Sequence, residues 1–215
     1  MQIKSVIPHL PLFSTPLAAS EKRHNASPLS ASLLALLLAT LTYTSTVLAE
    51  GDNIKSLVDQ AGVYTLTNLH PDEARSKLYS INFQQAGLIP LCTEVEIVKA
   101  NRKQIKFKVK ETGKAYKYDH HRNAGEDLDA NAAKYFGKQC NKDNVAKLSE
   151  VDQDGVKQGR ALVGMSKQGV IYAIGYPPVA KTPTLDATVW KYWSNRFNTF
   201  DVVFSADGKV THVNN

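Results

Sequence analysis

The segment GMSKQGVIYAIGYPP (Gly164–Pro178) carries start and stop signals for one short helix. Ser166 is a suitable N-cap, because its hydroxyl can accept a hydrogen bond from a backbone N–H of the first turn. The residues that form an apolar face at helical spacing are Val170, Ile171 and Ile174. Gly175 suits the C-terminal end of a helix, and the two prolines that close the segment cannot continue one. We therefore predict a helix from Ser166 to Gly175, preceded at Asn141–Gly159 by a short helix and a turn-rich connection.

The residues that follow predict a three-stranded antiparallel sheet. The strand sequences are TVWKYW (188–193) and TFDVVFSADGKVTHV (199–213). Within the second sequence, Asp207-Gly208 is a typical hairpin turn. On a strand, Trp190 and Tyr192 would share one face, while Trp193 would point the other way. Burying one large aromatic ring removes about 150–250 Å² from water, so we expect Trp190 and Tyr192 to form much of the core of this half.

Trp193 is the better candidate for a contact surface, together with residues near it in the sequence. Trp, Tyr and Arg dominate the binding energy of many protein interfaces. The candidate partner contacts are Tyr176, Trp193, Asn195 and Arg196. For Arg196, an ion pair with Asp186 or Asp201 is an equally good prediction.

The order of these motifs resembles that of the SmpA/OmlA, or BamE-like, domain of bacterial envelope lipoproteins. The matching segments are Gly164–Val170, Ile174–Pro178, Trp190–Trp193 and Val203–Val210, within residues 141–215. The resemblance implies a BamE-like, β-lactamase-inhibitor-like α+β domain, in which two short helices pack on a three-stranded antiparallel sheet. It also implies a binding role in outer-membrane protein assembly or envelope integrity. Two features differ from the family pattern: Glu50 stands where lipid attachment would need a cysteine, and a further module precedes the domain.

The first half of the chain predicts an antiparallel meander. Its three strand sequences are Thr93–Val98, Gln104–Lys110 and Ala115–His120. In the middle strand apolar residues alternate with lysines, so one face is predicted to be buried and the other solvated. Three further elements are expected: a strand at Gly62–Leu69 and helices at His70–Ser80 and Leu128–Cys140. Gly137 suits the cap of the last helix. These elements, and the similarity of Leu88–Ala100 to the opening of SH3-like barrels, predict a small SH3-like antiparallel β-barrel at residues 50–140.

Residues 99–117 hold eight basic side chains against one acid, Glu111. Two interpretations are open. The segment is either a solvated sheet face, in which Glu94 and Glu96 lie opposite lysines, or a patch for nucleic acid, lipid headgroups or anionic glycans. The outward positions carry no interleaved aromatic residues, which a single-stranded nucleic acid would need for stacking. Nucleic acid is therefore not predicted as a partner.

No arrangement of residues predicts catalysis, a metal site or a cofactor. His120 and His121 are adjacent, and adjacent side chains on a strand point to opposite faces, so the pair is a poor metal site. Ser166 beside Lys167 fits a helix cap, and no nucleophile stands at a characteristic spacing from a base. The sequence therefore predicts a non-enzymatic protein.

Residues 1–49 are typical of a secretory signal peptide. Basic residues precede an uncharged run with a leucine-rich centre, and the run ends in small residues up to Ala49, after which we expect cleavage. The alternative is an uncleaved anchor, because Ser30–Ala49 is about 20 residues long and barely spans a bilayer. With Glu50 after the cleavage site, the protein is predicted to be periplasmic, either soluble or peripherally associated with the outer membrane, and not a lipoprotein.

Cys92 and Cys140 are the only cysteines in the sequence. In an exported protein an isolated pair is more often bridged than free, so a disulfide is expected, with two buried thiols as the alternative. The leading functional hypothesis is a non-enzymatic periplasmic binding or scaffold protein with an envelope protein as its partner. The second hypothesis is a peptidoglycan- or glycan-binding protein, in which the SH3-like module binds through its basic face with Tyr116 and Tyr118 as contacts.

Overall fold

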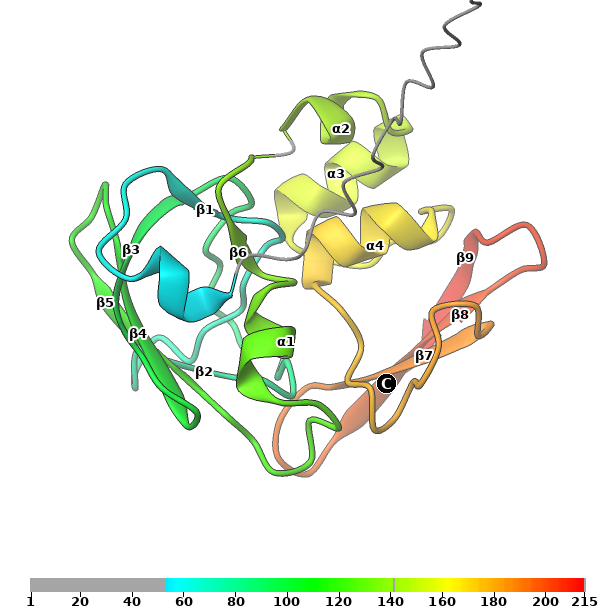
Figure 1. The fold of residues 1–215 in the computed structure, drawn as a ribbon. Coiled ribbons are helices and arrows are strands. Elements are labelled where there is room, and N and C mark those ends of the chain that lie inside the picture. Colours follow the sequence, from blue (N-terminus) through cyan, green and yellow to red (C-terminus); the bar gives the residue numbers. More distant parts are fainter. Residues whose placement is uncertain (1–52, 141, 215) are drawn as a thin grey trace, which may run out of the picture. The chain divides into compact units, whose positions relative to one another are not determined.

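The computed structural model describes residues 53–140 and 142–214, and all of them belong to one compact unit. The predicted signal peptide at residues 1–49 lies outside the described residues. The fold is mixed α+β, as predicted, with a six-stranded sheet, a three-stranded antiparallel sheet and short helices (Figure 1). The SH3-like and BamE-like architectures, and a boundary between residues 140 and 141, stay predictions.

The first half of the described chain contains the six-stranded sheet, in the order β2-β5-β4-β3-β1-β6. Its strands are β1 (Val63–Thr65), β2 (Lys77–Tyr79), β3 (Glu94–Ala100), β4 (Gln104–Val109), β5 (Ala115–Asp119) and β6 (Phe136–Gly137). The helices beside it are the 3₁₀ helix η1 (Ile54–Leu57) and α1 (Leu128–Ala132). β2 pairs with β5 in parallel, and every other pair of neighbours is antiparallel.

The predicted meander is confirmed in β3, β4 and β5. The inward residues of β4 are buried: Ile105, Phe107 and Val109. The lysines between and after them are exposed, so the alternation along this strand separates core from solvent. A bulge between Ile97 and Lys99 shifts the register, and β3 continues to Ala100.

The helix predicted at His70–Ser80 is wrong. Asp72 and Lys77 exchange two backbone hydrogen bonds (2.8 and 3.1 Å), which closes a tight turn before β2. The Asp72 carboxylate accepts from the backbone N–H of Arg75 and pairs with its guanidinium, so it stabilises the turn and not a helix N-terminus. The turn residues are polar apart from one alanine, and a helix there would have no apolar face to bury. Leu78, by contrast, is buried as part of β2.

Helix α1 is shorter than predicted. It begins after Asp127, whose carboxylate accepts a backbone N–H of the first turn, and it ends at Ala132. Gly137 does not cap this helix, because it lies in β6 and pairs with β1. Tyr135 and Phe136 are nevertheless buried, so the apolar side chains reach the core from a non-helical segment.

The described part of the second half contains three helices and the three-stranded antiparallel sheet, in the order β7-β8-β9. These elements are α2 (Lys142–Ala146), α3 (Glu150–Gln158), α4 (Lys167–Ile174), β7 (Val189–Trp193), β8 (Thr199–Phe204) and β9 (Val210–Asn214). The helix between Ser166 and Gly175 and the three strands are confirmed. The turn-rich connection predicted before Gly159 is wrong, because Ser149 caps helix α3 there and Gly159, at φ 64°, ends it.

One buried carboxylate joins the beginnings of α3 and α4. Asp152 is 1% exposed and accepts hydrogen bonds from the Ser149 hydroxyl (2.6 Å) and from the backbone N–H and hydroxyl of Ser166 (2.7 and 3.1 Å). Ser149 and Ser166 are the N-caps of the two helices, so a single side chain fixes both caps. Gly169 makes this approach possible, because a Cβ there would lie 2.6 Å from the carboxyl carbon of Asp152.

The two halves of the unit are joined by polar contacts at the C-terminal end of α4. The last carbonyls of a helix have no partner within the helix. Here two asparagines of the first half satisfy them. Asn68 donates to the Ala173 carbonyl (3.1 Å). Asn82 donates to the carbonyls of Ile174 (2.9 Å) and Tyr176 (2.8 Å).

The aromatic core and the disulfide agree with the sequence-based expectations. Trp190 and Tyr192 are fully buried in an apolar cluster that includes residues of α4 and the three-stranded sheet. Cys92, just before β3, is bonded to Cys140, which follows β6, with their Cα atoms 5.1 Å apart. By loop entropy alone such a bond contributes about 4 kcal/mol to stability.

Candidate functional site

Trp193 and Arg196, two of the predicted contact residues, lie together in a surface recess of about 330 Å³. The residues that line it, which we call the aromatic recess, are Ile81, Phe83, His121, Arg122, Asn123, Trp193 and Arg196. Its lining comes from both halves of the chain. The recess is therefore assembled by the junction between them.

Backbone pairing fixes the two largest rings of the recess. Trp193 is the last residue of β7, and its carbonyl accepts a hydrogen bond from the N–H of Gln84 (2.8 Å). This bond places Phe83 beside Trp193, and their ring centroids are 6.4 Å apart in an edge-to-face arrangement. The Gln85 side chain donates to the Ser194 carbonyl (2.8 Å) and ties the same two segments together.

His121 packs edge-to-face against Phe83, with ring centroids 5.8 Å apart. Its backbone N–H donates to the Ser80 hydroxyl (2.9 Å), which fixes the residue just beyond the end of β5. Burial lowers the pKa of His121 below its usual 6.5, and the neighbouring Arg122 and His120 lower that pKa further. His121 is therefore predominantly neutral at pH 7, and the positive charge of the recess comes from its arginines.

Cationic side chains accompany the aromatic rings of this region. Lys181 lies with its Nζ 5.4 Å from the centroid of the Trp193 ring, and the Arg196 guanidinium lies 4.5 Å from that of Phe197. Within the described ranges, neither Arg122 nor Arg196 forms an ion pair. Both guanidinium groups are therefore available to an acidic partner.

The ion pair considered for Arg196 is not formed. Asp201 instead pairs with Lys191, directly opposite it across β7 and β8. Asp186 accepts a hydrogen bond from the Thr184 hydroxyl (3.3 Å). The interpretation of Arg196 as a structural ion-pair partner of either aspartate is wrong.

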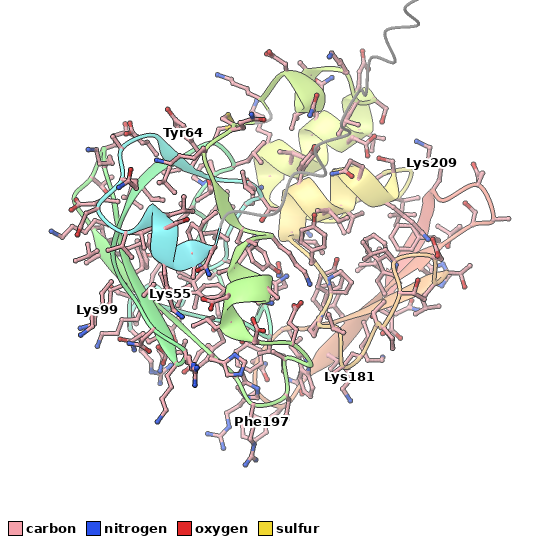
Figure 2. All side chains as sticks on the ribbon, in the orientation of Figure 1. Lys55, Tyr64, Lys99, Lys181, Phe197 and Lys209 are labelled. Carbon is pink, nitrogen blue, oxygen red and sulfur yellow. A yellow bond between two sulfur atoms is a disulfide. The ribbon has the colours of Figure 1, made fainter. Side chains whose placement is uncertain are left out.

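A second hollow, of about 520 Å³, shares Phe83 and Arg196 with the aromatic recess. Its other lining residues are Asp72, Arg75, Tyr79, Gln85, Asn195, Phe197 and Asn198. Phe197 is 74% exposed and projects from the surface (Figure 2). Asn195, a predicted contact, shapes the turn that carries it: its Oδ1 accepts from the backbone N–H groups of Phe197 (2.9 Å) and Asn198 (3.0 Å).

Tyr176, the fourth predicted contact residue, does not line the aromatic recess. Its half-buried ring packs edge-to-face against Tyr135, with centroids 6.0 Å apart, and the Lys134 Nζ lies 5.6 Å from its centroid. Burial raises the pKa of Tyr176, as expected for a phenol removed from water. Its ring contacts both apolar clusters of the unit.

Tyr116 and Tyr118, the aromatic contacts of the glycan-binding hypothesis, are only 5% and 2% exposed. They occupy the inward positions of β5, where they belong to the same apolar cluster as Phe107. Their prediction as surface contacts is wrong, and the basic face of the meander has no aromatic contact from either residue.

Phe83, His121 and Arg122 were not predicted as site residues. Phe83 lies in the polar stretch NFQQ (82–85), and nothing in that stretch indicates which aromatic residue it will meet. The adjacent histidines His120 and His121 were considered only as a metal site, for which they are a poor pair, and nothing in their sequence indicates an aromatic contact. Within residues 53–140 and 142–214, no group of three or more His, Cys, Asp or Glu residues is placed to hold a metal ion.

The chemistry of the recess is that of a binding surface. It offers aromatic rings and two guanidinium groups. The indole nitrogen of Trp193 is itself buried and has no hydrogen-bond partner among the described residues. Guanidinium groups bind carboxylates in a bidentate geometry, and aromatic rings bury apolar area.

In the part of the chain that the structure describes, no helix is long and apolar enough to cross a membrane.

Comparisons of the chain with known protein families, with curated proteins and with solved structures found no match. The resemblance to BamE-like domains and to SH3-like barrels therefore stays a prediction from the order of motifs.

Proposed function

We propose that this protein is a non-enzymatic binding or scaffold protein of the bacterial cell envelope, and that it recognises an envelope protein through the aromatic recess. The proposal includes export to the periplasm, where the protein is soluble or peripherally associated with the outer membrane. It also includes a link to outer-membrane protein assembly or envelope integrity, which the motif resemblance implies.

One observation carries the proposal: Trp193, Phe83, Arg122 and Arg196 converge on one recess, and neither arginine forms an ion pair with a described residue. Trp and Arg are enriched among the residues that dominate interface energies. A matching partner would insert an apolar side chain between the rings and place a carboxylate against the arginines. The disulfide between Cys92 and Cys140 supports export, because disulfides persist in oxidising compartments and are rare in the cytosol.

Site-specific photocrosslinking in cells that naturally make the protein tests this proposal. A photoreactive phenylalanine analogue is placed at Phe197, beside the recess, and in a second strain at Val163, which is 63% exposed and lines neither of the two hollows. We expect a discrete crosslinked product from position 197 and none from position 163. Mass spectrometry of that product should identify an envelope protein.

Two charge variants make the test specific. Arg196→Glu should abolish the product from position 197, because it puts a negative charge where a partner carboxylate would bind. Arg160→Glu changes an exposed arginine outside the recess and should leave the product unchanged. If the product survives Arg196→Glu, or if both crosslinker positions give the same products, the recess is not the partner surface.

A further inference from the structure

The outer face of the six-stranded sheet carries a row of lysines that share no residue with the aromatic recess. Lys99 of β3 lies directly opposite Lys106 of β4, and Lys106 lies opposite Lys117 of β5. Lys77 of β2 lies opposite Lys117 and continues the row. Four neighbouring strands thus present the same charge at the same level of the sheet.

Only one lysine of this row is neutralised by a described residue. Lys77 pairs with Asp119 at 2.5 Å, whereas Lys99, Lys106 and Lys117 form no ion pair anywhere in the described ranges. Like charges directly opposite each other destabilise a sheet. A face that needs only to be solvated can interleave acids with its lysines. The uninterrupted row therefore argues against a purely solvated face.

In the adjoining row of the sheet an acid lies opposite a lysine, which is the pairing that the lysine row lacks. There, Glu96 of β3 lies opposite Lys108 of β4, as expected for a solvated face with cross-strand partners. The two rows are on the same side of the same strands, so the fold does not explain why one pairs unlike charges and the other like charges. The residue types at equivalent positions explain it.

The positive charge extends in two dimensions. Strands lie about 4.8 Å apart and rise about 3.4 Å per residue, so the row spans about 14 Å across the sheet. Along the chain, Lys106 and Lys108 of β4 and Lys110 just after it span about 14 Å. The exposed basic residues of this surface, which we call the lysine face, are Lys99, Arg102, Lys103, Lys106, Lys108, Lys110 and Lys117. The acids near it are Glu94, Glu96, Glu111 and Asp119, of which Asp119 pairs with Lys77. In Figure 2, Lys99 points away from the sheet.

We propose that the lysine face binds the anionic headgroups of a lipid bilayer. A planar membrane presents a two-dimensional array of negative charge, which matches the two-dimensional spread of the lysine face. Clusters of four to eight lysines and arginines are typical of segments that bind anionic lipids. All residues of the lysine face except Arg102 are lysines. A lysine ammonium acts as a point charge toward phosphate and needs no fixed geometry. The outward positions of β4 and β5 carry no aromatic ring that could stack on bases or sugars.

Vesicle binding of the protein, purified as the cell produces it, tests this inference. The probes are vesicles of phosphatidylcholine alone and of an equal mixture of phosphatidylcholine and phosphatidylglycerol. Any affinity that does not depend on charge appears on both. Each lysine near an anionic surface strengthens binding about fivefold, so the triple variant Lys99→Gln, Lys106→Gln and Lys117→Gln should bind the mixed vesicles about 100-fold more weakly. High salt should remove the difference between the two vesicle types.

The matched control removes the same charge elsewhere. Lys142→Gln, Lys147→Gln and Lys157→Gln change three exposed lysines on α2, on α3 and between them. This control should lose no more than about fivefold, the value of a single surface lysine. Circular dichroism and thermal melting confirm that both triple variants are folded; we expect the first to melt no lower than the original protein, because it removes like-charge pairs.

The proposal is overturned if both triple variants lose the same affinity, since net charge alone would then explain binding. It is also overturned if the original protein does not prefer the mixed vesicles. Polygalacturonate and single-stranded DNA are tested at the same salt concentration. If either binds more tightly than the mixed vesicles and depends on the same three lysines, the partner is a linear polyanion and not a membrane.

Discussion

Replacing Asn68 by alanine should lower the free energy of unfolding by about 3 kcal/mol, because this side chain joins three separate segments of the chain. Asn68 is 2% exposed. Its Nδ2 donates to the carbonyls of Val156 (2.7 Å) in α3 and Ala173 (3.1 Å) in α4, and its Oδ1 accepts the N–H of Leu91 (2.7 Å). All three side-chain hydrogen bonds are lost together in the alanine variant.

The expected loss of unfolding free energy depends on which hydrogen bonds each partner of Asn68 keeps in the alanine variant. A buried hydrogen bond contributes about 1 kcal/mol net, and a buried donor left unpaired costs about 1–3 kcal/mol. The Val156 carbonyl keeps the N–H of Gly159 (3.2 Å), and the Ala173 carbonyl keeps the ring nitrogen of His70 (3.2 Å). The N–H of Leu91 keeps no such alternative among the bonds of the described chain, so its loss is the largest contribution.

Urea unfolding with the disulfide intact measures this effect. With an m-value of about 2 kcal/mol/M, a loss of about 3 kcal/mol lowers the midpoint by about 1.5 M. Asn68→Asp should lower the free energy of unfolding more than Asn68→Ala does, because it turns a charged oxygen toward two carbonyls. Asn101→Ala is the control, and it should cost about 1 kcal/mol or less. Among the described residues, its exposed side chain accepts only from the N–H groups of Lys103 (2.9 Å) and Gln104 (3.0 Å) in its own turn. A cost below about 1 kcal/mol for Asn68→Ala, or an aspartate variant as stable as the alanine one, would refute the reasoning.

Three further predictions test the electrostatics. Lys106→Glu should raise the free energy of unfolding by about 1 kcal/mol in urea titrations, because two like-charge cross-strand pairs become attractive; a destabilised variant would contradict this. Burial lowers the pKa of His70 below 6.5, so its contribution to stability is present above that pH and is lost as the pH falls through 6.5 toward the folded-state pKa. His70→Gln should therefore reduce the acid-dependent loss of stability, measured by urea titrations at several pH values, and an unchanged slope would assign it to other groups. Arg122→Gln should raise the pKa of His121 measured by NMR, and an unchanged pKa would show that Arg122 does not contribute to its lowering.

Elements with local signals could be predicted from the sequence. The limits of α4 follow from Ser166 and Gly175. The side chain of Ser166 caps the first turn of the helix, and the backbone of Gly175 ends the last one. The meander follows from the alternation of apolar and charged residues, which has the period of a strand. In both cases the physical cause of the structure lies in residues that are close together in the chain.

Elements that form only by pairing with residues far away in the sequence could not be predicted. β2 exists because Lys77–Tyr79 pairs in parallel with β5, and no residue within His70–Ser80 indicates a partner about 40 positions away. The Phe136–Gly137 strand depends in the same way on β1. The same distinction applies to the site. The residue types of Trp193 and Arg196 marked them as contacts, whereas Phe83 joins them through bonds between distant segments, such as the backbone bond between Gln84 and Trp193.

The origin of the recess decides how its function can be tested. Phe83 reaches Trp193 because the segment after β2 is held at the C-terminal end of α4, where Asn82 binds the carbonyls of Ile174 and Tyr176. A fragment cut at the predicted boundary between residues 140 and 141 would separate Phe83 and His121 from Trp193. It would also leave the last carbonyls of α4 without their donors from the first half. Loss of partner binding in such a fragment would therefore not locate the binding surface, whereas Arg196→Glu in the whole chain changes one exposed side chain of the recess and leaves these junction contacts in place.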